Sequence, residues 1–389
     1  MDIYSWILAL AIISGQLIKL PIAGQGGATV LDLAIILFCL LGLVKLKFKL
    51  KKPPLFLKSA MVFIVIAILS LMLTPLHLRP EEILISFFYT VRFAFYTLLC
   101  WIMLSGAFPA LKNDIQKILI LSGLTLAVAG LIQFLFLPDL RFLTAWGWDP
   151  HYFRTVSTFL DPNFAGAYLV LTLLLLIYAK EHLIGYHLVR GRIFYIFFVI
   201  LYVALLTTFS RSSYLMFLVS GTIWAVFQKS TKLFLITVIL FSILLLGFQI
   251  YVQLVASPRN IDREQSASFR FNTWEQGAIL FQKFPILGVG FNTYRYAIKQ
   301  FNLGDEQFLK SHGASSNDSS LLFVASTTGV VGLTAYLIFL ISLVKYSHPK
   351  NLVLGAAIGG LLIHSIFSNS LFYPPIFSWI MLISAVPKK

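Results

Sequence analysis

The chain has 389 residues, of which 59% are hydrophobic and 12% charged, and its mean hydropathy is +0.87. A soluble domain carries roughly 25% charged residues, so this composition excludes an ordinary soluble protein. The formal net charge of +15 would suit nucleic-acid binding. However, most lysines stand in short loops between apolar runs, where they set membrane topology, and we expect no nucleic-acid partner.

Apolar runs of roughly 18 or more residues recur along the chain, each long enough to cross a bilayer as a helix. Helices are expected because they satisfy their own backbone hydrogen bonds where water is absent. The sequence therefore predicts an all-α polytopic membrane protein with about twelve transmembrane helices. They are expected at about 3–20, 28–46, 55–75, 83–107, 116–138, 163–179, 193–209, 211–227, 233–254, 318–344, 352–369 and 375–387.

Basic residues support an even number of helices, because they follow every second predicted helix. They are Lys45, Lys47, Lys49, Lys51, Lys52, Lys112, Lys117, Lys180, Arg190, Arg192, Lys229, Lys232, Lys345, Lys350, Lys388 and Lys389. The positive-inside rule assigns these loops and both termini to the cytoplasm. Residues 1–20 lack a basic leading region and are expected to form the first helix rather than a signal peptide.

Two long connections lie on the opposite face, at about 138–162 and 255–317. Connections of this length are usually functional or disordered. The second is expected to contain short helices, because Trp274, Leu280, Phe281 and neighbouring apolar residues can form a small amphipathic helix. We predict a single integral membrane domain over 1–389, with 255–317 as an extracytoplasmic loop between helices nine and ten.

Arginines at membrane depth or on the extracytoplasmic face are candidate functional residues, since such charges are costly there. Arg92 lies inside the fourth predicted helix and is a candidate buried residue, whereas Arg154, Arg211, Arg270 and Arg295 lie on the outer face. Guanidinium groups bind phosphate oxygens bidentately and stay charged. We therefore predict a phosphate or diphosphate site, with snorkelling or ion pairing of single arginines as the alternative.

Two further candidates precede the tenth predicted helix. His312 could act as a general base near neutral pH, or it could be a loop histidine in water. Asp318, like the Asp161-Pro162-Asn163 run, could simply cap a helix. His364 is expected in the middle of helix eleven, where a buried packing role is the alternative to a functional one. Cys39 and Cys100 lie in apolar runs without metal spacing. We find no cofactor motif and expect neither a metal nor a cofactor.

Four segments in order resemble the O-antigen ligase and O-antigen polymerase superfamily. They are Arg154 with STF-x-DPN-x-AGAYL, the TFSRSSYL turn, Arg270-x3-Trp274 with residues 284–294, and His312 with residues 318–333. The resemblance implies a GT-C-like glycosyltransferase in the bacterial inner (cytoplasmic) membrane. It would transfer a glycan from an undecaprenyl diphosphate carrier to a lipid, glycan or protein acceptor on the extracytoplasmic face, with inversion and without metal.

The resemblance further implies that Arg211 and Arg270 bind the diphosphate, that Arg154 assists, and that His312 orients or deprotonates the acceptor. Many family members place the histidine beside an asparagine at the start of the following helix, whereas Asn317-Asp318 stands there in this chain. Either His312 or Asp318 could therefore be the base. The alternative function is a transporter or flippase for a lipid-linked saccharide, which should have a midplane site between related halves. We find no internal repeat.

Overall fold

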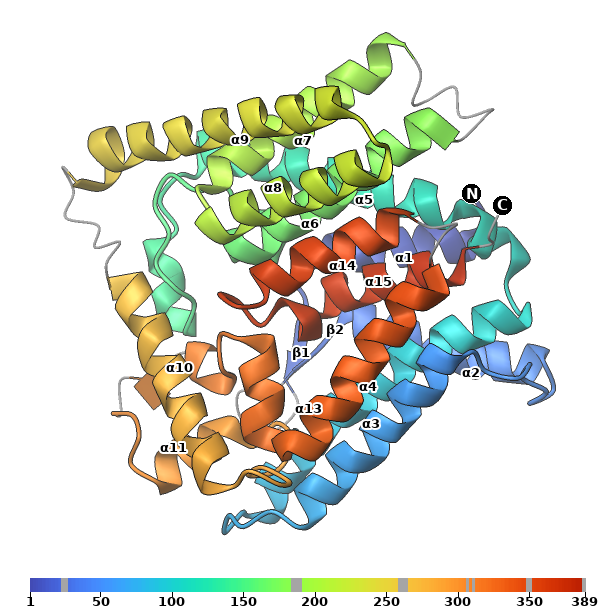
Figure 1. The fold of residues 1–389 in the computed structure, drawn as a ribbon, viewed down its shortest axis with the longest axis vertical. Coiled ribbons are helices and arrows are strands. Elements are labelled where there is room, and N and C mark those ends of the chain that lie inside the picture. Colours follow the sequence, from blue (N-terminus) through green and yellow to red (C-terminus); the bar gives the residue numbers. More distant parts are fainter. Residues whose placement is uncertain are drawn as a thin grey trace.

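The computed structural model describes residues 1–21, 27–182, 191–257, 265–305, 308–309, 312–347 and 352–386. These residues form a bundle of helices with one small hairpin of two antiparallel strands (Figure 1). The elements are α1 (Ile3–Ser14), β1 (Lys19–Pro21), β2 (Gly27–Thr29), α2 (Val30–Lys45), α3 (Leu55–Met72), α4 (Pro80–Ser105), α5 (Pro109–Phe136), α6 (Pro162–His182), α7 (Arg192–Thr208), α8 (Arg211–Phe227), α9 (Thr231–Tyr251), α10 (Gln265–Lys283), α11 (Tyr294–Gln300), α13 (Ser320–Ser347), α14 (Leu352–His364) and α15 (Pro374–Ala385).

Each predicted transmembrane segment contains a helix of the structure. Among the described residues, six helices are long and apolar enough to cross a membrane, namely α3, α4, α5, α6, α9 extended to Ala256, and α13. Several others, including α1, α7, α14 and α15, are apolar but shorter. The helical fold class is confirmed, whereas the count of twelve spans stays a prediction. Of the basic loop residues, Arg190, Lys350, Lys388 and Lys389 lie outside the described residues.

Three predicted helix boundaries are wrong. The fifth helix begins at Pro109 rather than near residue 116, so Lys112 and Lys117 lie within it and not in the loop before it. The first helix ends at Ser14, not near residue 20, because Gly15 adopts φ 54° and its backbone touches that of Thr158. A Cβ atom at Gly15 would lie 2.4 Å from the Thr158 carbonyl oxygen, so the chain turns there into the hairpin. Helix α14 ends at His364 rather than near residue 369, so His364 is not a mid-helix residue.

The two chain ends lie at one edge of the bundle, and α10 and α11 lie at the opposite edge (Figure 1). The described part of the long loop 255–317 is therefore gathered at a single end of the bundle. Its amphipathic helix was predicted correctly: it is α10, which packs against α13. The core between these ends is aromatic, and Phe93 of α4 stacks on Phe377 of α15 with ring centroids 4.8 Å apart.

Helix α13 is broken at Gly329, which has φ 64° and ψ −167°. The segment after α10 pairs with this break: the backbone N–H of Val289 donates to Ser326 O (3.1 Å), and Val330 N–H donates to Pro285 O (2.8 Å). The hydroxyl of Ser70 in α3 completes the pairing by donating to Leu287 O at 2.8 Å. Backbone groups freed by the break are thus satisfied inside the protein, as a low-dielectric surrounding requires.

We predict that Gly329→Ala destabilises the protein by about 2–3 kcal/mol and lowers its Tm by about 5 °C. A Cβ atom at this position would lie 2.1 Å from the Ile286 carbonyl oxygen, and the backbone conformation disfavours any other residue. Thermal unfolding of the detergent-purified protein measures the effect. Gly355→Ala in α14 is the control, because its Cβ would meet only ordinary van der Waals contacts. Equal Tm values for both variants would contradict the role of Gly329.

Candidate active site

The first long loop is fastened to the turn between α7 and α8. Thr155 N–H donates to Thr207 O (2.9 Å), and the two hydroxyls of these residues are 2.8 Å apart. The buried guanidinium of Arg154 donates from Nε to Thr208 O (2.9 Å) and from Nη2 to Phe209 O (3.3 Å). Arg154 therefore holds the backbone directly before Arg211.

Arg211 is the first residue of α8, and its side chain is exposed. Ser210 caps this helix end: its hydroxyl oxygen accepts from Ser213 N–H at 3.4 Å, and its hydroxyl donates to Asn163 Oδ1 at 2.8 Å. The guanidinium carbon of Arg211 lies 5.6 Å from the centre of the Phe248 ring. A helix amino terminus that also carries an arginine favours an anionic ligand.

Arg270 of α10 interacts electrostatically with four charged residues of the site. Its positive charge repels that of Arg211. It also interacts with the carboxylates of Asp149, Asp161 and Asp318. The structure therefore brings together three residues predicted from sequence, Arg211, Arg270 and Asp318, although they stand in three different segments of the chain.

Asp318 lies two residues before α13, and its Oδ2 accepts from the Thr273 hydroxyl at 3.3 Å. Desolvation raises the pKa of Asp318 to about 7, and the positive charge of Arg270 opposes this rise. The negative charges of Asp149 and Asp161 raise the same pKa further. A carboxyl group with a pKa near neutrality is suited to general-base catalysis.

The loop around Asp318 is anchored by Asn317, which is fully buried. Its side-chain amide donates to Thr273 O and, at 3.3 Å, to the hydroxyl of Tyr294, and its Oδ1 accepts from Ser319 N–H at 2.9 Å. The backbone of His312 begins a short 3₁₀ helix ending at Ser315. The side chain of His312 lies outside the described part of the structure, so its predicted role stays a prediction.

Arg295 and Arg92 interact with other residues than those of this site. Arg295 lies on α11, half-buried, and its electrostatic neighbours include Tyr296 and Tyr89 of α4. Its role in diphosphate binding stays a prediction. Arg92 forms a bidentate ion pair with Asp32 of α2, in which Nε and Nη2 are each 2.8 Å from a carboxylate oxygen. The hydroxyl of Tyr96 donates to the same carboxylate at 2.9 Å.

We predict that Arg92→Ala destabilises the protein by about 3–5 kcal/mol, because it leaves the carboxylate of Asp32 buried without its counter-ion. The side chains of Arg92 and Asp32 are only 17% and 7% exposed. The double variant Arg92→Met with Asp32→Leu should recover most of the lost stability, since no isolated charge is left. Yield and Tm in detergent are the measurements. A double variant as unstable as Arg92→Ala would contradict this account.

Several residues of the site were missed or undervalued from sequence. Asp161 does cap α6, because its carboxylate accepts from Asn163 N–H (2.6 Å) and Phe164 N–H (3.1 Å). The same carboxylate also interacts electrostatically with Arg270. Nothing in its local pattern distinguishes it from an ordinary cap. His364 was expected in the middle of a helix but ends α14. Its Nε2 lies 3.4 Å from the Ser213 hydroxyl, and its side chain interacts electrostatically with Arg270. The sequence around Asp149 indicates only a polar loop, which does not identify it as a site residue.

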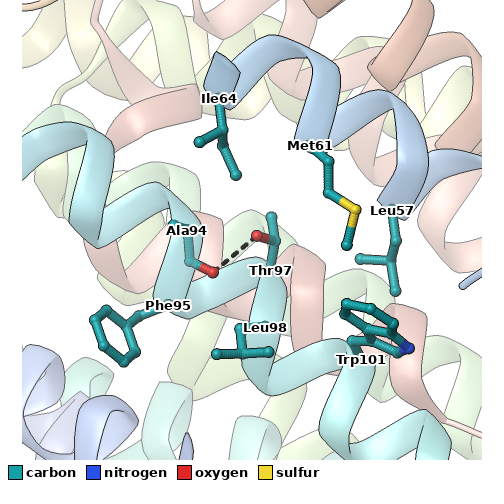
Figure 2. Close-up of a pocket in the computed structure, with 8 residues that line it drawn as sticks. All are labelled: Leu57, Met61, Ile64, Ala94, Phe95, Thr97, Leu98 and Trp101. Atoms are coloured by element: carbon teal, nitrogen blue, oxygen red, sulfur yellow. Dashed lines mark hydrogen bonds between the residues drawn. The ribbon is translucent and has the colours of Figure 1, made fainter. Parts of the chain in front are cut away.

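A cavity of about 300 Å³ lies elsewhere, between α3 and α4 (Figure 2). Its lining is almost entirely apolar and includes Met61, Leu98 and Trp101, with Thr97 donating its hydroxyl to the backbone. It offers neither a charge nor a nucleophile. The chemistry is therefore assigned to the arginine and aspartate cluster.

Among the described residues, no group of three His, Cys, Asp or Glu side chains could hold a metal ion.

Fold and site together define a multi-pass helical membrane protein with a site of arginines and carboxylates at the end of the bundle that carries α10. Residues 196–337 match the family model described as O-antigen ligase, which confirms the resemblance predicted from sequence. The match covers Arg211, Arg270, Arg295, His312 and Asp318. No curated protein matches the chain. Apolar helices and family together indicate a multi-pass protein of the inner membrane.

Proposed function

We propose that the protein is a glycosyltransferase of the O-antigen ligase or polymerase type. It transfers a glycan from an undecaprenyl diphosphate carrier to an acceptor hydroxyl at the extracytoplasmic face, with inversion and without a metal. Both termini are then cytoplasmic. The observation that carries the proposal is the convergence of Arg211 and Arg270 beside Asp318, within a segment that matches the O-antigen ligase family.

The arginines stabilise the leaving group. As the bond between the anomeric carbon and the diphosphate oxygen breaks, negative charge grows on the diphosphate, and fixed guanidinium groups lower the energy of that charge. The amino terminus of α8 adds its partial positive charge beside Arg211. Arg154 acts indirectly, because its Nε and Nη2 donate to the carbonyls of Thr208 and Phe209 and so position the backbone before Arg211.

A carboxylate completes the reaction on the acceptor side. The acceptor oxygen forms the new bond to the anomeric carbon and gives its proton to Asp318, whose pKa near 7 leaves it partly ionised at neutral pH. A single displacement of this kind inverts the anomeric carbon. His312 is the alternative base. Binding donor and acceptor in one geometry supplies a large part of the remaining rate enhancement.

A transfer assay in sealed vesicles that contain an undecaprenyl diphosphate oligosaccharide tests the proposal. Wild type is compared with Arg211→Ala and His312→Ala, with EDTA present throughout. We expect glycan to leave the carrier with wild type and not with Arg211→Ala. Glycan that stays on its carrier but crosses the bilayer would contradict the transferase and establish the flippase instead. A parallel wild-type assay without EDTA is the control, and activity seen only in that assay would contradict metal independence.

A further inference from the structure

Several polar atoms near the site are buried without a hydrogen-bond partner among the described residues; besides Nδ1 of His364 and the hydroxyl of Tyr373 there are three more. They are Nε1 of Trp274, Oδ1 of Asn369 and Oγ of Ser370. Buried polar atoms in folded proteins are nearly always paired, and an unpaired one is destabilising. Three in one neighbourhood indicate a partner outside the described residues.

The three atoms belong to two segments that pack together. Trp274 follows Arg270 by one turn of α10, so both side chains lie on the same helix face. The indole ring of Trp274 contacts Phe367, with ring centroids 5.8 Å apart. Phe367, Asn369 and Ser370 all belong to the connection 365–373 between α14 and α15. This connection therefore lies directly beside the arginine helix.

The same connection is fastened to both other parts of the site. Ser320, two residues after Asp318, donates its N–H to Ser365 O (2.8 Å) and accepts from Leu371 N–H with its hydroxyl (3.2 Å). At the far end, the Tyr373 ring stacks on Phe164 with centroids 4.0 Å apart and an interplanar angle of 2°. The connection thus spans from the Arg270 and Asp318 side to the Asp161 side. It lies outside residues 196–337, the segment matched by the family model.

We propose that Trp274, Asn369 and Ser370 form a carbohydrate subsite for the sugar that is attached to the donor diphosphate. This inference rests on the proposed function and deepens it. A sugar ring offers hydroxyls that both donate and accept, which suits an indole N–H, an amide oxygen and a serine hydroxyl together. Its C–H faces pack on aromatic rings such as Trp274. Four residues of helix rise about 6 Å, so Trp274 stands about one sugar ring from a diphosphate held by Arg270.

Binding measurements with two lipids test the subsite. The full chain in nanodiscs is titrated with undecaprenyl diphosphate carrying the oligosaccharide and, separately, with bare undecaprenyl diphosphate. We expect Trp274→Phe, Asn369→Ala and Ser370→Ala each to weaken binding of the glycan-bearing lipid about 10-fold, since each removes one hydrogen-bonding group. Binding of the bare lipid should change less than about 2-fold. Arg270→Ala should weaken the binding of both lipids.

Two controls separate recognition from structure. Ser384→Ala, at the other end of α15, removes a hydroxyl that is paired with Ile380 O at 2.7 Å and should leave both affinities unchanged. Ser370→Ala should leave Tm equal or raise it, because it removes an unpaired polar atom. A fall in Tm would show that the hydroxyl is paired within the protein and would overturn the subsite.

The remaining outcomes are distinct. Unchanged affinity of all three variants for the glycan-bearing lipid, with the bare lipid still bound, would overturn the subsite and leave the proposed function standing. Failure of the wild-type protein to bind either lipid would overturn the proposed function and the subsite with it.

Discussion

Arg270→Ala is expected to lower the rate of glycan transfer by about 10²- to 10³-fold. Arg270 is the residue whose charge reaches Arg211 as well as the three carboxylates of the site. Without it, the leaving diphosphate loses a fixed cation, and Asp318 loses the positive charge that favours its ionised form. The measurement is the initial rate of transfer in vesicles at saturating acceptor.

Arg141→Ala is the matched control for this variant. Arg141 lies in the first long loop, and its ion pair with Asp139 is exposed, the two side chains being 56% and 45% accessible. Such pairs contribute little to stability, so the rate should stay within about 2-fold of wild type. Arg270→Lys should retain part of the activity, because it keeps the charge but not the bidentate geometry. Near-normal transfer by Arg270→Ala in a folded protein would contradict the diphosphate role.

Asp318→Asn is expected to lower the rate of transfer by about 10²- to 10⁴-fold, since the amide cannot accept the proton of the acceptor hydroxyl. The wild-type rate should also depend on pH. A base with a pKa of about 7 acts in its deprotonated form, so the rate should fall by about 10-fold between pH 8 and pH 6. The residual activity of Asp318→Asn should lack this dependence. Initial rates across this range are the measurement.

The stability of the same variant gives an independent check. The folded pKa of Asp318 is raised above its usual value of about 4. The folded protein therefore holds this proton more tightly than the unfolded chain, and stability falls as pH rises from about 4 through about 7. Asp318→Asn avoids this loss and should be more stable than wild type at pH 8. Full activity of Asp318→Asn with none in His312→Ala would assign the base to His312. A wild-type rate independent of pH between 6 and 8 would contradict a base with a pKa of about 7.

The helical content and order could be predicted from the sequence because they depend on local apolarity. The run from Leu55 to Met72 is long and apolar enough to cross a membrane as a helix, which satisfies its own backbone hydrogen bonds there. Helix ends were less predictable: the end of α1 depends on contact between Gly15 and Thr158, which is distant in sequence. Arg211, Arg270 and Asp318 could be chosen as candidates because charges at an apolar boundary are conspicuous.

What the sequence alone determined was the class of protein. It also predicted a single face for the chemistry and arginines as the side chains that bind the ligand. Only the tertiary structure decided which of these arginines lie within electrostatic reach of one another. Arg92 and Arg270 are both cations near apolar segments, but Asp32 neutralises Arg92 while α10 places Arg270 beside Arg211 and Asp318. The pairing of charges depends on distances between helices far apart in the chain, and no local pattern records those distances. The polar atoms of Asn369 and Ser370 likewise come near Trp274 only because α10 packs against the connection between α14 and α15.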